Sequence, residues 1–389
     1  MNRLICFLGA TLMSLPLMAG AGLEQVSFSF YSEQLSLNYD PGMVLPLPAK
    51  FTESDLSGYY LRLEKTNYKP FLEALEQKKA VFQLNDWLFF DLMRQSLKNI
   101  LGERDHQRLE LLSWFLLSKS GFNTRLTYLE DQLYVYAYSE DEIFETPMIQ
   151  EDGKVFVNLS CIGLQSKQEA LYLLNFKPPG GKKPFQLTLK QLPKLRPEIK
   201  ERTLTFSYRN HPYQLKVKAD ATIGEIMNKY PLMAEEQYLE TPLSPGLEET
   251  LIPAFRKWTS ELSVWESVEL IVSFTRSAFP YKEDKQYFGR SKPMISDEVF
   301  LYPFSDCEDR AALFFELAKT LLDIPMIIIA FPDHLTVAAA IPNGAGEAIK
   351  YKNKLYYVCD PTGPVNSSTI GSFPQGYENA SFEIIYAYK

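Results

Sequence analysis

Two stretches of this 389-residue chain resemble each other, and that repetition constrains the fold more than any other feature. The first begins F-S-F-Y-S-E-Q-L-S-L-N-Y-D at Phe28. The second begins F-S-Y-R-N-H-P-Y-Q-L-K-V at Phe206, 178 residues later (206 minus 28). Trp87 and Trp265 lie in helix-like stretches at the same separation. We therefore favour two copies of one α+β unit over a chance likeness between segments of similar secondary structure.

Further along the chain the separation of the matching stretches increases. R-L-E-L-L-S-W-F-L-L from Arg108 resembles R-A-A-L-F-F-E-L-A-K from Arg310, 202 residues later (310 minus 108). The second copy therefore carries 24 additional residues (202 minus 178) between Trp265 and Cys307, in an aromatic and charged stretch. Extra sequence in one copy favours a wall that faces a substrate, and a solvated insertion without a role is the alternative.

The first residues predict export. M-N-R is followed by an apolar run from Leu4 to Met18 and by A-G-A ending at Ala21, which is typical of a cleaved secretory signal peptide over residues 1–21. The run is too short to span a bilayer comfortably, and no later segment is long and apolar enough. We expect a secreted or periplasmic protein whose mature chain has no membrane span.

The rest of the chain divides into three parts. Residues 22–161 form the predicted N-terminal copy, and residues 204–389 form the C-terminal copy. Between them, residues 162–203 contain the turn-rich runs K-P-P-G-G-K-K-P and Q-L-P-K-L-R-P around a short predicted strand, F-Q-L-T-L. We expect this stretch to be a β-containing linker.

Composition excludes several classes of function. A net charge of −8 gives no basic surface for nucleic acid. The chain has three histidines and no close Cys/His spacing, so we predict no zinc site and no cofactor. Cleavage of the signal leaves Cys161, Cys307 and Cys359; an odd number leaves at least one thiol unpaired within the chain, although Cys161 and Cys359 could pair.

Three residues of the second copy suggest thiol chemistry: Cys307, His334 and Asp360. Ser305 and Glu308 match a capping box, which predicts a helix beginning at Asp306 or Cys307. M-I-I-I-A-F then predicts a central strand, His334 opens the next strand, and Asp360 ends Y-Y-V-C-D. A cysteine attacks as the thiolate, and a nearby imidazole is a common means of forming one. Singly, each residue is more ordinary as packing or turn chemistry.

The first copy lacks these groups. Subtracting 202 from the three positions gives Asp105, Gln132 and Asn158, in similar local patterns. The first copy is therefore predicted to keep the fold without the chemistry.

The string D-C-E-D-R-A, the helix, the strand opened by His334 and the run Y-Y-V-C-D-P-T together resemble the transglutaminase-like superfamily over about residues 260–365. The D-C-E-D string is most similar to bacterial transglutaminase-like cysteine proteinases. The resemblance implies a papain-like α+β core, with Cys307 as nucleophile, His334 as general base and acid, and Asp360 orienting the imidazole. Glu308 and Leu335 depart from residues common in the family.

The resemblance leaves two features of the site open. The side chain that completes the oxyanion hole is unassigned, with Tyr302, Tyr287 and Trp265 as candidates. Some exported relatives hold calcium beside the nucleophile, and Asp306, Glu308 and Asp309 could supply oxygens. Acidic residues that simply favour a helix start are the simpler interpretation, so we predict no metal.

Two hypotheses about function follow. The first is an exported cysteine-dependent hydrolase or acyltransferase that acts on amide bonds of peptide or protein substrates. The alternative is a catalytically inactive binding or assembly module, in which the site is retained only as core. The sequence does not indicate an oligomeric state.

Overall fold

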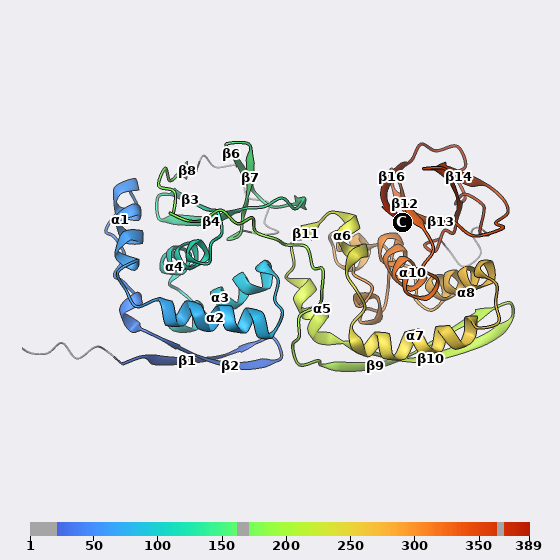
Figure 1. Ribbon diagram of the computed structural model, residues 1–389, viewed down its shortest axis with the longest axis horizontal. Coiled ribbons are helices and arrows are strands. Elements are labelled where there is room, and N and C mark those ends of the chain that lie inside the picture. Colours follow the sequence, from blue (N-terminus) through green and yellow to red (C-terminus); the bar gives the residue numbers. More distant parts are fainter. Residues whose placement is uncertain (1–21, 162–170, 364–368) are drawn as a thin grey trace, which may run out of the picture.

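The computed structural model describes residues 22–161, 171–363 and 369–389 (Figure 1). The predicted signal peptide, residues 1–21, lies outside this range. Among the described residues, no helix combines the length and the apolar character that crossing a membrane requires.

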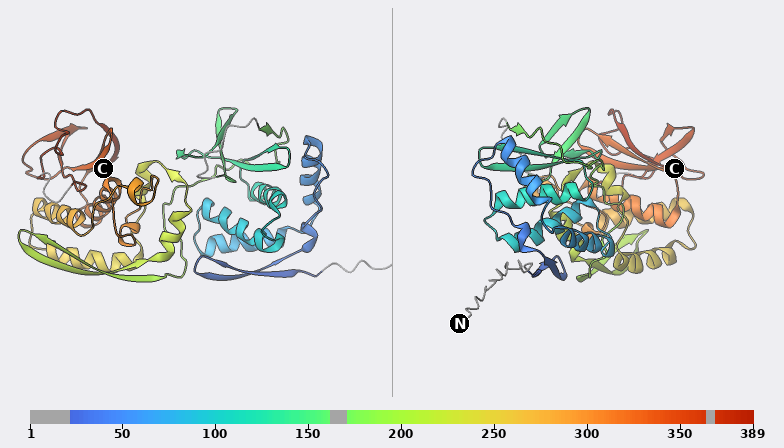
Figure 2. Two further views of the ribbon diagram at one scale, coloured as in Figure 1. Left: turned by 180° about the vertical axis from the view of Figure 1, so that it is seen from behind. Right: turned by 60° about the vertical axis from the view of Figure 1, so that its left-hand side comes forward.

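Two units lie side by side, and each has a β-hairpin on one side, helices in the middle and a sheet on the other side (Figures 1 and 2). The first unit consists of the hairpin β1 (Glu24–Phe30) and β2 (Glu33–Tyr39), the helices α1 (Glu53–Leu63), α2 (Lys69–Val81), α3 (Asp86–Leu101) and α4 (His106–Lys119), and a sheet of β3 (Thr124–Leu129), β4 (Gln132–Tyr138), β6 (Met148–Glu151), β7 (Lys154–Asn158) and β8 (Tyr172–Leu173).

The second unit repeats this arrangement. Its hairpin is β9 (Ile199–Tyr208) and β10 (His211–Asp220); its helices are α5 (Ala221–Asn228), α6 (Glu235–Glu240), α7 (Pro245–Thr259), α8 (Val264–Ser277), α9 (Asp284–Tyr287) and α10 (Cys307–Leu322); its sheet contains β12 (Met326–Phe331), β13 (His334–Ala339), β14 (Ala348–Tyr351), β15 (Lys354–Val358) and β16 (Glu383–Tyr388).

The two five-stranded sheets share one topology. Their strand orders are β6-β7-β4-β3-β8 and β14-β15-β13-β12-β16, and every pair is antiparallel. The predicted α+β class with antiparallel sheets is therefore confirmed, and M-I-I-I-A-F is an interior strand as predicted. A papain-like relationship stays a prediction.

The register of the strands follows the repeats found in the sequence. Phe28 pairs with Leu35 in one hairpin and Phe206 pairs with Tyr213 in the other, so both partners keep the 178-residue separation. Within the sheets, β3 and β4 pair in the same register as β12 and β13 at the 202-residue separation. Because register depends on both turn geometry and the buried face, this agreement supports duplication of one unit.

The third predicted counterpart in the first unit is wrong. Tyr136 pairs with Asn158, whereas Ala338 pairs with Val358, so Asn158 corresponds to Val358 and Ser160 corresponds to Asp360. A shift of two residues preserves the alternation of buried and exposed positions along a strand, so the sequence pattern could not reveal it.

The start of the helix shifts the first counterpart as well. His106 and Cys307 are the first residues of α4 and α10, while Asp105 and Asp306 cap them. By helix position, the counterpart of Cys307 is therefore His106 rather than Asp105. Gln132 and His334 each open a strand, as predicted.

The two units are joined through β5 (Ile143–Phe144) of the first and β11 (Leu232–Met233), which pair antiparallel. Residues of α5, among them Ile223 and Ile226, are buried in the same apolar cluster as the helices of the first unit. The two units are therefore connected both by strand pairing and by a shared apolar cluster.

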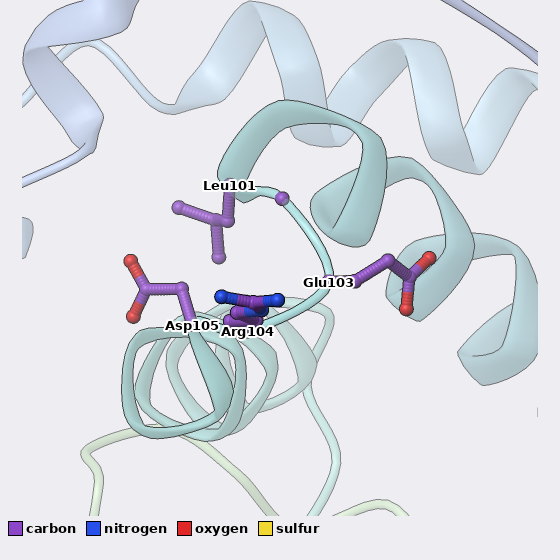
Figure 3. Close-up of a pocket in the computed structure, with 5 residues that line it drawn as sticks. Leu101, Glu103, Arg104 and Asp105 are labelled. Atoms are coloured by element: carbon purple, nitrogen blue, oxygen red, sulfur yellow. The ribbon is translucent and has the colours of Figure 1, made fainter.

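The additional residues of the second copy lie between α8 and α10, and part of this insertion is core. Lys292 and Glu298 form a buried ion pair, and the N–H of Met294 donates to Asp309 Oδ1 at 2.9 Å. A wholly solvated insertion is therefore wrong. In the first unit, a short turn connects α3 to α4; Figure 3 shows Leu101, Arg104 and Asp105 beside a surface cavity of about 540 Å³ there.

The predicted strand F-Q-L-T-L is wrong, although its alternation of buried residues is right. Phe185, Leu187 and Leu189 are buried, but the segment pairs with no strand of the described chain. The N–H groups of Leu187 and Thr188 donate instead to the Asp141 carboxylate, so hydrogen bonds to a side chain take the place of hydrogen bonds to a neighbouring strand.

Candidate functional site

His334 and Asp360 are in direct contact at one end of the second sheet. His334 Nε2 lies 3.2 Å from Asp360 Oδ1, and the Asp360 side chain is fully buried. His334 is the first residue of β13, and Asp360 follows β15, the neighbouring strand. Pairing of these strands therefore fixes the separation of imidazole and carboxylate.

Several groups hold the Asp360 carboxylate in place. The hydroxyls of Thr336 and Thr362 donate to Oδ1 at 3.3 and 3.0 Å. The Arg276 guanidinium, from α8, donates to the Asp360 carbonyl and lies 3.3 Å from Oδ2. Burying a carboxylate is costly unless it is paired and hydrogen-bonded, and these contacts meet that requirement.

The contact with Asp360 fixes the orientation of the imidazole. An ionised carboxylate accepts only, so Nε2 is the protonated nitrogen and Nδ1 is left as the acceptor. The ring is also stacked on Tyr377, with centroids 5.1 Å apart and planes 23° apart, and the Tyr377 hydroxyl donates to Asp333. The imidazole is thus held on its edge and on one face.

Cys307 is the first residue of α10, which confirms the predicted helix start. The capping pair differs from the predicted Ser305 and Glu308: Asp306 is the N-cap, and Asp309 Oδ2 accepts the N–H of Asp306 at 3.0 Å. Ser305 and Asp306 each have an acidic residue three positions later, so the sequence pattern fits both pairs.

The surroundings of the thiol oppose its ionisation. Cys307 Sγ donates to Glu308 Oε2 at 2.8 Å. Burial raises the pKa of Cys307, repulsion from the Glu308 carboxylate raises it further, and only the facing backbone N–H of Leu335 favours the thiolate. The resting thiol is therefore protonated.

The structure brings two of the three predicted residues together and places the third beside them. The backbone N–H of Leu335, the residue after His334, is close enough to Cys307 to favour its thiolate, so the sulfur lies near the start of β13. Within the described ranges there is no hydrogen bond between Cys307 and His334. The thiol is instead engaged by Glu308.

Two of the three candidate oxyanion donors, Tyr302 and Trp265, are engaged by other side chains. The Tyr302 hydroxyl donates to Asn228 and the Trp265 indole donates to Glu269, while the Tyr287 ring packs on two phenylalanines. The structure places a different tyrosine, Tyr281, near Cys307, and no sequence pattern singles this residue out.

Tyr281 belongs to the insertion and is positioned by Ser305. The two residues form a parallel bridge, and the N–H of Lys282 donates to the Ser305 carbonyl at 3.2 Å. The half-exposed Tyr281 ring lies under the Arg310 guanidinium, 5.1 Å from its centroid. Burial raises the pKa of Tyr281, and its electrostatic interaction with Cys307 and Asp306 raises it further, so the phenol is a neutral donor near the thiol.

Three buried carboxylates lie next to Cys307 and could hold a cation: Asp284, Asp306 and Asp309. One oxygen from each lies within 4.8 Å of the others. Glu308, considered from the sequence, faces the thiol instead, and Asp284 comes from the insertion. Burial raises the pKa of all three, and in Asp306 repulsion from Asp309 adds to it. Oxygen-only ligands suit calcium or magnesium, whereas bound protons would satisfy the same group without metal.

Cys161 and Cys359 are free thiols, so the pairing considered from the sequence is wrong. Cys359 is fully buried and directly follows β15 in the second unit, and Cys161 follows β7 in the first unit. The two cysteines therefore belong to different sheets.

Comparisons of the chain with protein-family models, with curated proteins and with solved structures found no match.

Proposed function

We propose that this protein is a cysteine-dependent hydrolase or acyltransferase that acts on amide bonds of peptides or proteins. The observation that carries the proposal is the imidazole of His334, bound through Nε2 to a fully buried carboxylate and leaving Nδ1 as acceptor beside a helix-starting cysteine. A base oriented by a third group next to a nucleophile is the usual arrangement for covalent acyl transfer.

In the proposed reaction, the proton of Cys307 moves to His334 Nδ1 as the sulfur bonds to the substrate carbonyl carbon. The Asp360 carboxylate stabilises the imidazolium. The developing oxyanion is stabilised by N–H groups of the first turn of α10 and by the phenol of Tyr281. His334 then protonates the leaving amine as the C–N bond breaks, which leaves a thioester on Cys307.

Release of the acyl group decides between the two reaction types. If His334 deprotonates water, attack on the thioester completes hydrolysis; if it deprotonates an amine, a new amide forms. In either case the thiolate leaves and regains a proton from the imidazolium.

Glu308 must turn away from the thiol before this reaction. Its bond to Sγ keeps Cys307 protonated and occupies the hydrogen that His334 would accept. The resting site is therefore in a low-activity arrangement, and substrate contact with Glu308 is the simplest means of release.

The same bond favours the second candidate function, a binding module without chemistry. A thiol held by a carboxylate and raised in pKa is what an inert site would show.

Casein with a dansyl-labelled primary amine separates these functions. We expect casein cleavage, dansyl incorporation or both, and loss of either in Cys307→Ala. Cleavage without incorporation indicates a hydrolase, and the reverse indicates an acyltransferase. Neither reaction in wild-type protein, together with a Cys307 that no acyl donor modifies, would favour the binding module.

A further inference from the structure

The first unit contains a cavity of about 300 Å³ at the place that corresponds to the thiol site of the second unit. It is bordered by His106 and Glu110 of α4, by Gln132 and Tyr134 of β4, and by Ser160 and Cys161, which follow β7. In the second unit the start of α10, the start of β13 and the residues after β15 enclose Cys307, His334 and Asp360. The first unit thus has a cavity at this place and lacks the three residues of the triad.

The floor of this cavity holds a buried ion pair. Arg94 Nη2 and Nη1 bind Glu110 Oε1 and Oε2 at 2.6 and 2.8 Å, and the Ser160 hydroxyl donates to Oε2 at 2.6 Å. Glu110 is only 7% exposed. The Arg94 and Ser160 side chains are therefore ordered around the Glu110 carboxylate.

The sister unit has no ion pair at these two helix positions, and a buried arginine of that unit, Arg276, pairs with Asp360 instead. Arg94 corresponds to Val272 at the 178-residue separation, and Glu110, the fifth residue of α4, corresponds to Ala311, the fifth residue of α10; both counterparts are buried apolar residues. Replacing a buried apolar pair by an ion pair costs desolvation and is a poor means of stabilising a core. A pair built at the floor of an open cavity is better explained by recognition of a ligand.

The charges around the cavity select the class of ligand. Glu110 is already balanced by Arg94, and the Asp131 carboxylate at the edge of the cavity is exposed and screened by water, so a cation gains little there. The two carboxylates disfavour an anion. Gln132 and Tyr134 add amide and hydroxyl groups at the mouth, where the Tyr134 hydroxyl donates to Gln132 Oε1 at 2.6 Å. A neutral amide, which carries both a donor and an acceptor, complements this lining.

We propose that this cavity binds an amide-bearing segment of a peptide without cleaving it. The proposal rests on the proposed function only in taking a peptide as the ligand; the cavity and its ion pair do not depend on catalysis. A peptide bound in this cavity and at the site of the second unit at the same time would gain affinity from having two contacts.

Alkylation of Cys161 reports occupancy, because this thiol borders the cavity and is partly exposed. The probe is N-acetyl-glutaminyl-glycinamide at about 10 mM, with iodoacetamide at about pH 9 and peptide mass mapping. With a dissociation constant on the order of 1 mM, usual for so small a ligand, the probe should slow Cys161 alkylation about tenfold. Ethylammonium and propionate at the same concentration should not slow it.

The matched variant is Arg94→Val with Glu110→Ala, which copies the apolar pair of the second unit and so should fold. We expect the probe to lose its protection of Cys161 in this variant. No protection in wild-type protein, equal protection in the double variant, or equal protection by ethylammonium would each overturn the proposal. If Cys161 is protected while no acyl donor modifies Cys307, the proposed function fails and the binding cavity stands.

Discussion

Replacing Glu308 by glutamine should make Cys307 more reactive, because it removes the carboxylate that holds the thiol proton. The contact is 2.8 Å between Sγ and Oε2. Two unit charges about 4 Å apart interact by ~4 kcal/mol at an effective dielectric constant near 20. At ~1.4 kcal/mol for each pKa unit, this would be about three units. Partial exposure of both groups and screening by salt reduce the expected decrease in the Cys307 pKa to about one to two units.

A lower pKa increases the thiolate fraction but also lowers the intrinsic nucleophilicity of the sulfur. With a Brønsted coefficient of about 0.4–0.5, the net increase in alkylation rate at neutral pH is roughly threefold to fifteenfold. The assay is iodoacetamide alkylation followed over a pH series by peptide mass mapping, and Cys161 and Cys359 serve as internal controls in the same digest.

Glu283→Gln is the matched control, since Glu283 is an exposed carboxylate of the same region that does not touch the thiol. Its Cys307 should react as in the wild-type protein. An unchanged rate in Glu308→Gln, or an equal gain in Glu283→Gln, would refute the view that the Glu308 contact controls the thiol.

Three further perturbations test the surroundings of the site. Arg276→Met leaves the Asp360 carboxylate buried with fewer partners and should lower the free energy of unfolding, measured by urea denaturation, by about 3–5 kcal/mol. The control, Arg209→Met, breaks an exposed ion pair and should leave the urea midpoint nearly unchanged. Tyr281→Phe should slow acylation by p-nitrophenyl acetate about 100-fold without lowering the melting temperature, and an unchanged rate would remove Tyr281 from the oxyanion site. Burial raises the pKa of Asp306, so the folded protein keeps a proton that the unfolded chain loses above about pH 4, and stability falls as pH rises through that window. Asp306→Asn should therefore gain stability over wild type between about pH 5 and 8, and a pH-independent difference in urea midpoint would contradict this.

The parts of the site that depend on local pattern could be predicted from the sequence. Helix-capping residues, hydrophobic periodicity and turn residues, each read over a few positions, predict three elements: the helix beginning at Cys307, the strand Met326–Phe331 and the strand opened by His334. The two strands pair with each other in the same register as their counterparts in the first unit, 202 residues earlier.

The parts that depend on long-range contacts could not. Tyr281 and Asp284 reach the site because the insertion returns to Ser305 through a parallel bridge, which no local pattern announces. The Glu308 contact depends on a rotamer, and the shift from Asn158 to Ser160 preserves strand alternation.

Acyl transfer from p-nitrophenyl acetate, followed by intact-protein mass and peptide mapping, tests most directly whether Cys307 is a nucleophile served by His334. We expect one acetyl group, on Cys307, which forms and is then hydrolysed, with formation at least about 100-fold slower in His334→Ala. An unmodified Cys307 in wild-type protein, or an equal rate of acetylation in His334→Ala, would contradict it.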